Sequence, residues 1–126
     1  MQKHRAFHSF KRYTRESLSS DLEITPQQLA RIREHREPVR LIDVREPFEL
    51  QLGHLEDAEA IPMRSIPAHL ASLDDDERPI VVMCHHGVRS LQVVCWLREQ
   101  GVENCRSLAG GIDRWSLEVD PAVPRY

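Results

Sequence analysis

Cysteine is scarce in this 126-residue chain, and the three that occur, Cys84, Cys95 and Cys105, show no C-x-x-C spacing. An odd number without such spacing predicts neither a disulfide framework nor a zinc knuckle, and it favours a reducing compartment. The sequence also lacks an apolar run long enough to cross a membrane, and it lacks a signal-peptide pattern at its start. We therefore expect a cytoplasmic protein that has no membrane partner.

The net charge of −3 is unevenly distributed, because residues 1–20 carry five basic side chains against Glu16 alone. This basic N-terminal segment is predicted to be flexible, as a solvated tail; a first helix packed on the domain and a transit peptide are the alternatives. The remaining residues carry a net charge of −7, which argues against a nucleic-acid partner.

Short apolar segments alternate with helical patterns along the rest of the chain. Strands are predicted at 22–24, 39–44, 59–61, 80–83 and 105–108, and helices at 26–35, 46–52, 65–73, 90–100 and 110–119. Because the run 80–83 is apolar on both faces, it is predicted to lie at the centre of a parallel sheet. The fold class is therefore α/β, with one domain over residues 21–120, helices on both faces of the sheet and a C-terminal tail at 121–126.

A cysteine stands between the central strand and the next helix, in the run 83–90. Backbone N–H groups converge there, and together with the positive end of the helix dipole they stabilise an anion such as a thiolate, the reactive form of cysteine. Arg89 adds a fixed positive charge at the end of the loop. In parallel sheets ligands bind beyond the carboxyl ends of the strands, which is where Cys84 lies. Cys84 is therefore predicted to be a nucleophile in an anion cradle.

Four segments of the chain resemble signatures of the rhodanese (sulfurtransferase) family. The loop 83–90 is similar to that family's active-site loop, and Leu41–Glu49, Gly53–Ala58 and Gly110–Trp115 are similar to its other signatures, in the same order and spacing. The resemblance covers about residues 22 to 120. It implies a five-stranded parallel sheet flanked by helices on both faces, with sulfur transfer as the reaction.

The resemblance also implies a mechanism and a set of site residues. Cys84 would be catalytic: its thiolate takes the outer sulfur of thiosulfate or a similar small anion, and the persulfide passes it to cyanide, a small thiol or a protein thiol. The substrate would be bound by the remaining loop residues, His85, His86, Gly87, Val88, Arg89 and Ser90. No cofactor or metal is needed, and the sulfur of Cys84 is expected to face an open cleft.

Loop length separates this hypothesis from phosphatase chemistry. Four residues lie between Cys84 and Arg89, whereas the cysteine phosphatases that share the rhodanese fold use C-x5-R. One more residue widens the cradle for a tetrahedral oxyanion, so the shorter loop favours sulfur transfer. Arg89 either attracts the anionic donor or locks the loop against a carboxylate, and Ser90 either caps the helix or donates its hydroxyl to the sulfur. Gly87 is expected to supply a backbone conformation that a Cβ would obstruct.

A second group of charged residues is interpreted as structural. Asp43, Arg45 and Glu46 are expected to form ion pairs that hold loops around the sheet, and Glu49 and His54 are expected to act in the same way. Their substitution is therefore predicted to reduce activity by disturbing the structure and not the chemistry.

Three other interpretations of these residues have weaker support than the nucleophile hypothesis. Metal binding by Cys84 with His85 and His86 is disfavoured, because adjacent loop residues rarely converge on one ion without a distant ligand. Cys95 and Cys105 are expected to be core residues, with a resolving thiol at Cys105 as the alternative. The second function class is a non-catalytic rhodanese-like interaction or redox-sensing module, against which the intact loop argues.

Overall fold

The computed structural model describes residues 22–126, so the segment predicted at 1–20 lies outside the described residues. Its elements are the strands β1 (Glu23–Ile24), β2 (Arg40–Asp43), β3 (Glu59–Ala60), β4 (Ile80–Met83) and β5 (Cys105–Leu108), the α-helices α2 (Pro26–Glu34), α3 (Pro47–Leu50), α4 (Leu70–Asp75), α5 (Val88–Glu99) and α6 (Gly111–Glu118), and the 3-10 helix η1 (Met63–His69). The strands form one five-stranded parallel sheet in the order β1-β5-β4-β2-β3. This architecture is the predicted one.

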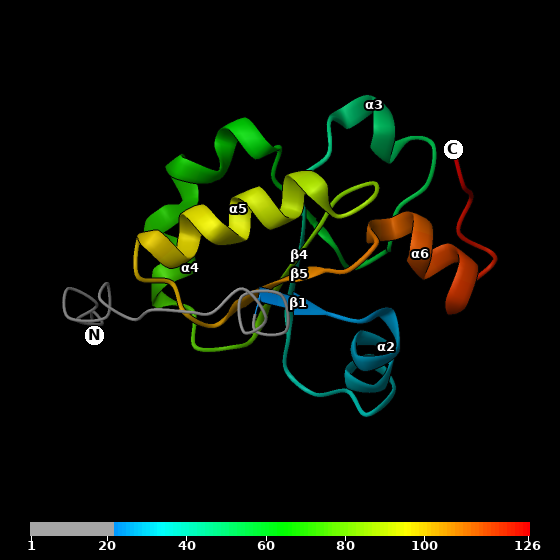
Figure 1. Ribbon diagram of the computed structural model, residues 1–126, viewed down its shortest axis with the longest axis horizontal. Coiled ribbons are helices and arrows are strands. Elements are labelled where there is room, and N and C mark those ends of the chain that lie inside the picture. The colour runs from blue at the N-terminus through cyan, green and yellow to red at the C-terminus, as the bar shows by residue number, and fades with distance from the viewer. Residues whose placement is uncertain (1–21) are drawn as a thin grey trace.

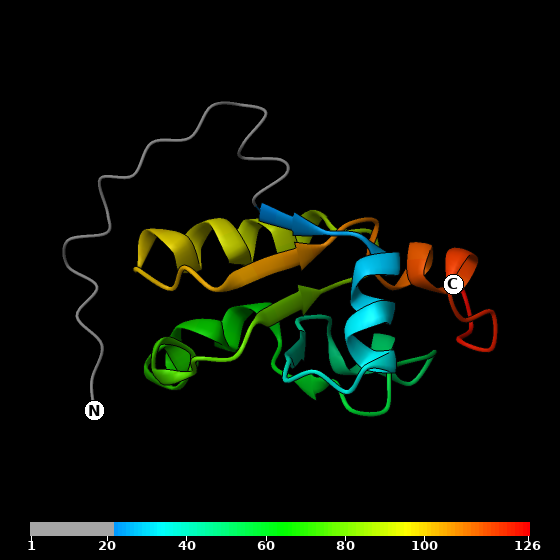
Figure 2. The ribbon, with the colours of Figure 1, turned by 90° about the horizontal axis from the view of Figure 1, so that it is seen from below.

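Helices cover both faces of the sheet (Figures 1 and 2). On one face, α5, η1 and α4 enclose the side chains of Ile42 and Val82. On the opposite face, α2 and α6 enclose Leu41, Val81 and Met83. All four residues of β4 are buried, as its continuous apolar sequence predicts. Among residues 22–126, the helices are too short or too polar for any of them to span a membrane.

Two helices differ from the sequence prediction, and proline and glycine account for both differences. The helix predicted at 65–73 is divided into η1 and α4, because Pro67 has no N–H to donate to an α-helical hydrogen bond. Helix α5 begins at Val88 and not at Ser90, because Gly87 adopts a left-handed conformation with φ of 98° at its start. Ser90 therefore lies in the first turn, and the predicted role as the helix cap is wrong.

The three cysteines differ in exposure. Cys84 and Cys105 are buried, whereas Cys95 is exposed, so the prediction that Cys95 is a core residue is wrong. The buried stripe of α5 repeats every three to four residues from Ser90 to Leu97 and leaves position 95 on another face. Most residues of Leu91–Leu97 are apolar, including some outside this stripe. The sequence therefore did not show which of them face the core.

The sheet brings two of the signature segments, Leu41–Glu49 and the loop 83–90, together at the carboxyl ends of its strands. Strands β2 and β4 pair in parallel, with Asp43 opposite Met83, so the residues that follow both strands leave the sheet together. Cys84 therefore emerges beside Asp43 and Arg45 at the carboxyl end of the sheet, where parallel α/β folds bind their ligands.

Candidate active site

The sulfur of Cys84 lies in a small cradle of hydrogen-bond donors. Cys84 is 1% exposed. Its Sγ accepts hydrogen bonds from the backbone N–H groups of Gly87, at 3.1 Å, and of Ser90, at 3.3 Å. The Ser90 hydroxyl is also 3.3 Å from the sulfur, and it is 2.7 Å from the hydroxyl of Ser107. If Ser107 donates to Ser90, the Ser90 hydroxyl is left to donate to Cys84, so three donors can stabilise negative charge on this sulfur.

The local backbone explains why the donors converge. Gly87 has a φ of 98°, and a Cβ there would lie 3.1 Å from the backbone nitrogen of Gly110 and 3.4 Å from the carbonyl oxygen of Leu108. This turn starts α5 directly behind the sulfur, so the N–H of Ser90 in the first turn has no helical acceptor and points to Cys84. The positive end of the helix dipole lies at the same place.

Helix α6 holds the loop from the other side through its backbone. The N–H of Ile112 donates to the carbonyl of Cys84 at 2.9 Å, and the N–H of Asp113 donates to the carbonyl of His85 at 3.1 Å. This approach requires glycine at position 111, because a Cβ there would lie 2.6 Å from the Cys84 carbonyl oxygen and closer still to that of His85. Gly111 of the closing signature thus allows α6 to hold the cysteine loop.

Arg89 is engaged in a two-pronged ion pair. Its Nη1 and Nη2 donate to the two carboxylate oxygens of Glu49 at 2.7 and 2.8 Å. The same carboxylate accepts the backbone N–H of Glu46 at 3.1 Å and the hydroxyl of Tyr126 at 2.8 Å. The Arg89 hydrogen bonds lower the pKa of Glu49 to about 2 despite its burial, and Glu49 in turn raises the pKa of Arg89. Of the two roles predicted for Arg89, this geometry corresponds to locking the loop.

A second buried ion pair supports the first. Arg45 is fully buried, and its Nε and Nη2 donate to the Asp43 carboxylate at 2.9 and 2.7 Å. Its remaining donors reach the Gly53 carbonyl, at 2.8 Å, and the Tyr126 hydroxyl, at 2.9 Å. Because Tyr126 donates onward to Glu49, the two ion pairs form one connected network beside the loop. Asp43 and Arg45 thus lie as the structural interpretation expects.

Two residues of this site were missed by the sequence reasoning. Ser107 is a buried polar residue in β5, and a serine beside an apolar residue in a predicted strand is the signal that could have identified it. Tyr126 lies in the predicted tail, where nothing in the sequence pairs it with the loop. Its ring stacks on His85 with centroids 3.9 Å apart, and its main-chain oxygen accepts the Nε2–H of that histidine at 3.0 Å. Burial is the main reason that the pKa of His85 is lowered.

The predicted substrate-binding residues do not all reach the sulfur. Gly87 and Ser90 contact it directly, whereas Val88 is 66% exposed. His85 and His86 stack on one another with centroids 3.8 Å apart. The open cleft expected at the cysteine is not observed, because the loop wraps the sulfur and leaves it almost fully covered.

Comparison with known proteins places this architecture in a family. The rhodanese-like domain family matches residues 25–118, which is most of the chain. The chain belongs to the rhodanese-like family. Its fold is the rhodanese fold: a rhodanese-like domain protein from Staphylococcus aureus has a crystal structure that matches with a TM-score of 0.70 at 30% identity, covering 83% of this chain and 98% of that one.

Relatives of this rhodanese-like chain are named as sulfurtransferases. A "Sulfurtransferase" of Allochromatium vinosum is 35% identical over 101 residues, which cover 80% of this chain and 94% of the relative. The "Thiosulfate sulfurtransferase GlpE" of Pseudoalteromonas translucida is 33% identical over 90 residues, covering 71% and 85%. Another relative, 38% identical over 90 residues, is longer, and the match spans 30% of its length. These similarities support a sulfurtransferase role.

Proposed function

We propose that this rhodanese-like chain transfers sulfane sulfur from thiosulfate, or a similar small sulfur-containing anion, through a persulfide on Cys84. The observation that carries the proposal is the cradle around its sulfur, in which two backbone N–H groups lie within 3.3 Å and a hydroxyl at 3.3 Å. Such preformed donors stabilise a thiolate before the reaction and a negatively charged terminal sulfur after it.

The proposed cycle has two displacement steps. The Cys84 thiolate attacks the outer sulfur of thiosulfate, the sulfur–sulfur bond of the donor breaks, and sulfite leaves with the electron pair. The acceptor, which is cyanide, a small thiol or a protein thiol, then attacks the terminal sulfur of the persulfide. The bond to Cys84 breaks in this step, so the thiolate is restored without a change in the number of electrons on the protein.

The state of Arg89 supports sulfur transfer over phosphatase chemistry. Both ends of its guanidinium group donate to Glu49, at 2.7 and 2.8 Å, and this carboxylate is buried. An arginine engaged in this way is not free to bind the oxygens of a phosphate ester bidentately. This agrees with the short loop between Cys84 and Arg89, so thiosulfate should release sulfite while an aryl phosphate should not be hydrolysed.

Intact mass spectrometry tests the proposal directly. After incubation with thiosulfate, the full-length protein should gain the mass of one sulfur atom, and cyanide should remove it and yield thiocyanate. The gain should be absent in Cys84→Ser. Cys95→Ser is the matched control, because this thiol is exposed and makes no contact with the Cys84 sulfur, and it should behave like the wild type. A folded, reduced protein that gains no sulfur from any sulfane donor would instead support the interaction or redox-sensing module.

A further inference from the structure

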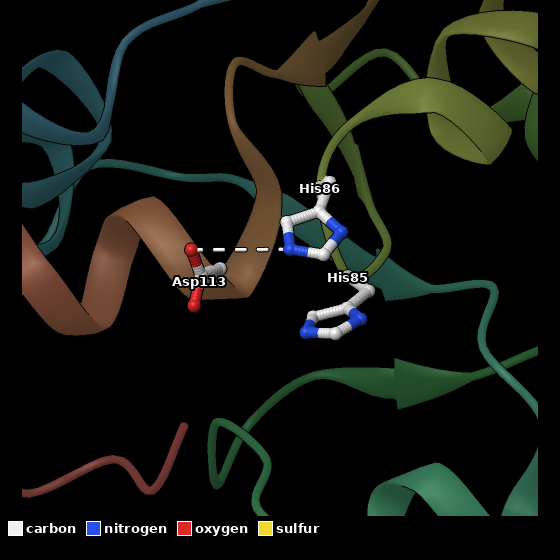
Figure 3. Close-up of side chains that lie close together, drawn as sticks. All are labelled: His85, His86 and Asp113. Atoms are coloured by element: carbon white, nitrogen blue, oxygen red, sulfur yellow. Dashed lines mark ion pairs between the residues drawn. The ribbon is translucent and has the colours of Figure 1, made fainter. Parts of the chain in front are cut away.

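Three possible metal ligands, two from the cysteine loop and one from a distant part of the sequence, meet at one place. They are the imidazoles of His85 and His86 and the carboxylate of Asp113, in the first turn of α6. One ligand atom from each lies within 4.8 Å of the other two (Figure 3). No step of the proposed sulfur transfer requires this cluster.

The backbone holds the three side chains together before any ion binds. The N–H of Asp113 donates to the carbonyl of His85 at 3.1 Å, and Gly111 lets the start of α6 and the cysteine loop approach this closely. The carboxylate of Asp113 is therefore fixed next to the histidine pair by the same contacts that fix the cysteine loop. The distant ligand that adjacent loop residues need for metal binding is thus supplied by another element.

One hydrogen bond of His85 competes with an ion. Nε2 of His85 lies 3.0 Å from the main-chain oxygen of Tyr126, which can only accept, so this nitrogen carries the proton of the neutral ring. Figure 3 shows that the same nitrogen faces Asp113, so an ion at the cluster takes the place of this proton and of its single hydrogen bond.

The spacing of His86 and Asp113 also fits an ion better than a hydrogen bond. Nε2 of His86 lies 3.9 Å from Oδ2 of Asp113, too far for a hydrogen bond. Two zinc–ligand bonds of about 2.1 Å at a tetrahedral angle separate the ligand atoms by about 3.4 Å. Since no pair of ligand atoms in the cluster is more than 4.8 Å apart, shifts of less than about 1.5 Å complete the site.

We propose that His85, His86 and Asp113 form a binding site for Zn²⁺, with two imidazole nitrogens, one carboxylate oxygen and a water molecule as ligands. Arg125 competes for the carboxylate: its Nε donates to Oδ1 of Asp113 at 2.8 Å, and its Nη2 donates to Oδ2 at 3.5 Å. The arginine side of this ion pair is exposed, and exposed pairs contribute little, so zinc can displace it. Zinc at this position joins the cysteine loop to α6 and is expected to inhibit sulfur transfer; that consequence rests on the proposed function, whereas binding does not.

Zinc binding is measured by calorimetry on the full-length Cys84→Ser protein, in which the reactive thiolate cannot act as a ligand. One ion per chain is expected to bind, and His86→Ala or Asp113→Asn in the same background should weaken this event about tenfold or more. His35→Ala is the matched control, because its exposed imidazole contacts the backbone carbonyl of Arg31 and does not belong to the cluster, so zinc affinity should be unchanged. Absence of the 1:1 event, or equal affinity in all four proteins, would overturn the proposal.

Inhibition provides a second readout in proteins that retain Cys84. For each protein, the ratio of thiocyanate formation with and without zinc is compared, so differences in basal activity cancel. Zinc should inhibit the wild type and His35→Ala at concentrations that leave Asp113→Asn uninhibited. Equal inhibition of all three would place zinc on Cys84 itself and overturn the site. Zinc binding to Cys84→Ser in a protein whose wild type transfers no sulfur would uphold the site and reject the proposed function.

Discussion

Replacing Glu49 with glutamine should destabilise the protein far more than the loss of an ordinary surface charge. The side chain of Glu49 is 7% exposed, and each of its oxygens accepts two hydrogen bonds. Glutamine has the same shape but carries an NH₂ group at one of these positions. In either orientation that group would face one N–H of the Arg89 guanidinium, together with the backbone N–H of Glu46 or the hydroxyl of Tyr126. Donors would therefore oppose donors, and Arg89 would lose its counter-charge.

The magnitude follows from the ion pair. Arg89 holds the pKa of Glu49 at about 2, below its ordinary value of 4.5. A difference of this size corresponds to about 3 kcal/mol of stabilisation by the charged carboxylate. Breaking a buried ion pair typically costs about 3 to 5 kcal/mol. Because the side chain of Arg89 is 34% exposed and partly solvated, we expect the lower end, a loss of about 3 kcal/mol in Glu49→Gln at neutral pH.

The loss should depend on pH in a defined direction. A carboxyl group whose pKa is lowered by folding stabilises the folded state above its unfolded pKa, here near 4.5, and this contribution disappears as the pH falls towards 2. The difference in the free energy of unfolding between the wild type and Glu49→Gln should therefore be constant above about pH 5 and shrink below it.

Urea denaturation followed by tryptophan fluorescence measures both effects, at pH 7 and at several values below 4.5. Glu118→Gln is the control, because it removes an exposed partner of Arg114 and should change the free energy of unfolding much less. If Glu49→Gln lost less than about 1 kcal/mol at pH 7, or if its deficit did not shrink in acid, the pair would behave as a surface ion pair and the reasoning would be refuted.

Two further substitutions test the cradle. Gly111→Ala forces a Cβ against the Cys84 carbonyl and requires a φ of 64°, so it should lose about 2 kcal/mol or more and most activity. Gly101→Ala shares the positive φ but lies away from the loop, so in denaturation and thiocyanate assays it should lose stability and keep activity. Ser90→Ala removes a charge-assisted hydrogen bond to the sulfur and should lower thiocyanate formation about tenfold without preventing persulfide formation; an unchanged rate would exclude a role for the hydroxyl.

Local sequence was sufficient to predict the centre of the site. The apolar run 80–83 predicted a central parallel strand, and the cysteine after it lies at the carboxyl end of that strand. Gly87 was predicted to supply a backbone conformation that a Cβ would obstruct, and its φ of 98° is such a conformation. These features depend on backbone chemistry within a few residues, so one segment contains all the information that they require.

Tertiary structure alone decided which groups surround that centre. Glu49 and Tyr126 reach Arg89 and Arg45 across 40 to 81 positions of sequence, and Asp113 reaches His86 only because α6 packs on the loop. Such pairs depend on how the strands are ordered in the sheet and on how each helix is rotated about its axis. Hydrophobic composition leaves both open, because apolar burial is not directional. The sequence by itself therefore determined the cysteine loop and its place at the end of the central strand, and packing determined the ion pairs, the cover over the sulfur and the histidine–aspartate cluster.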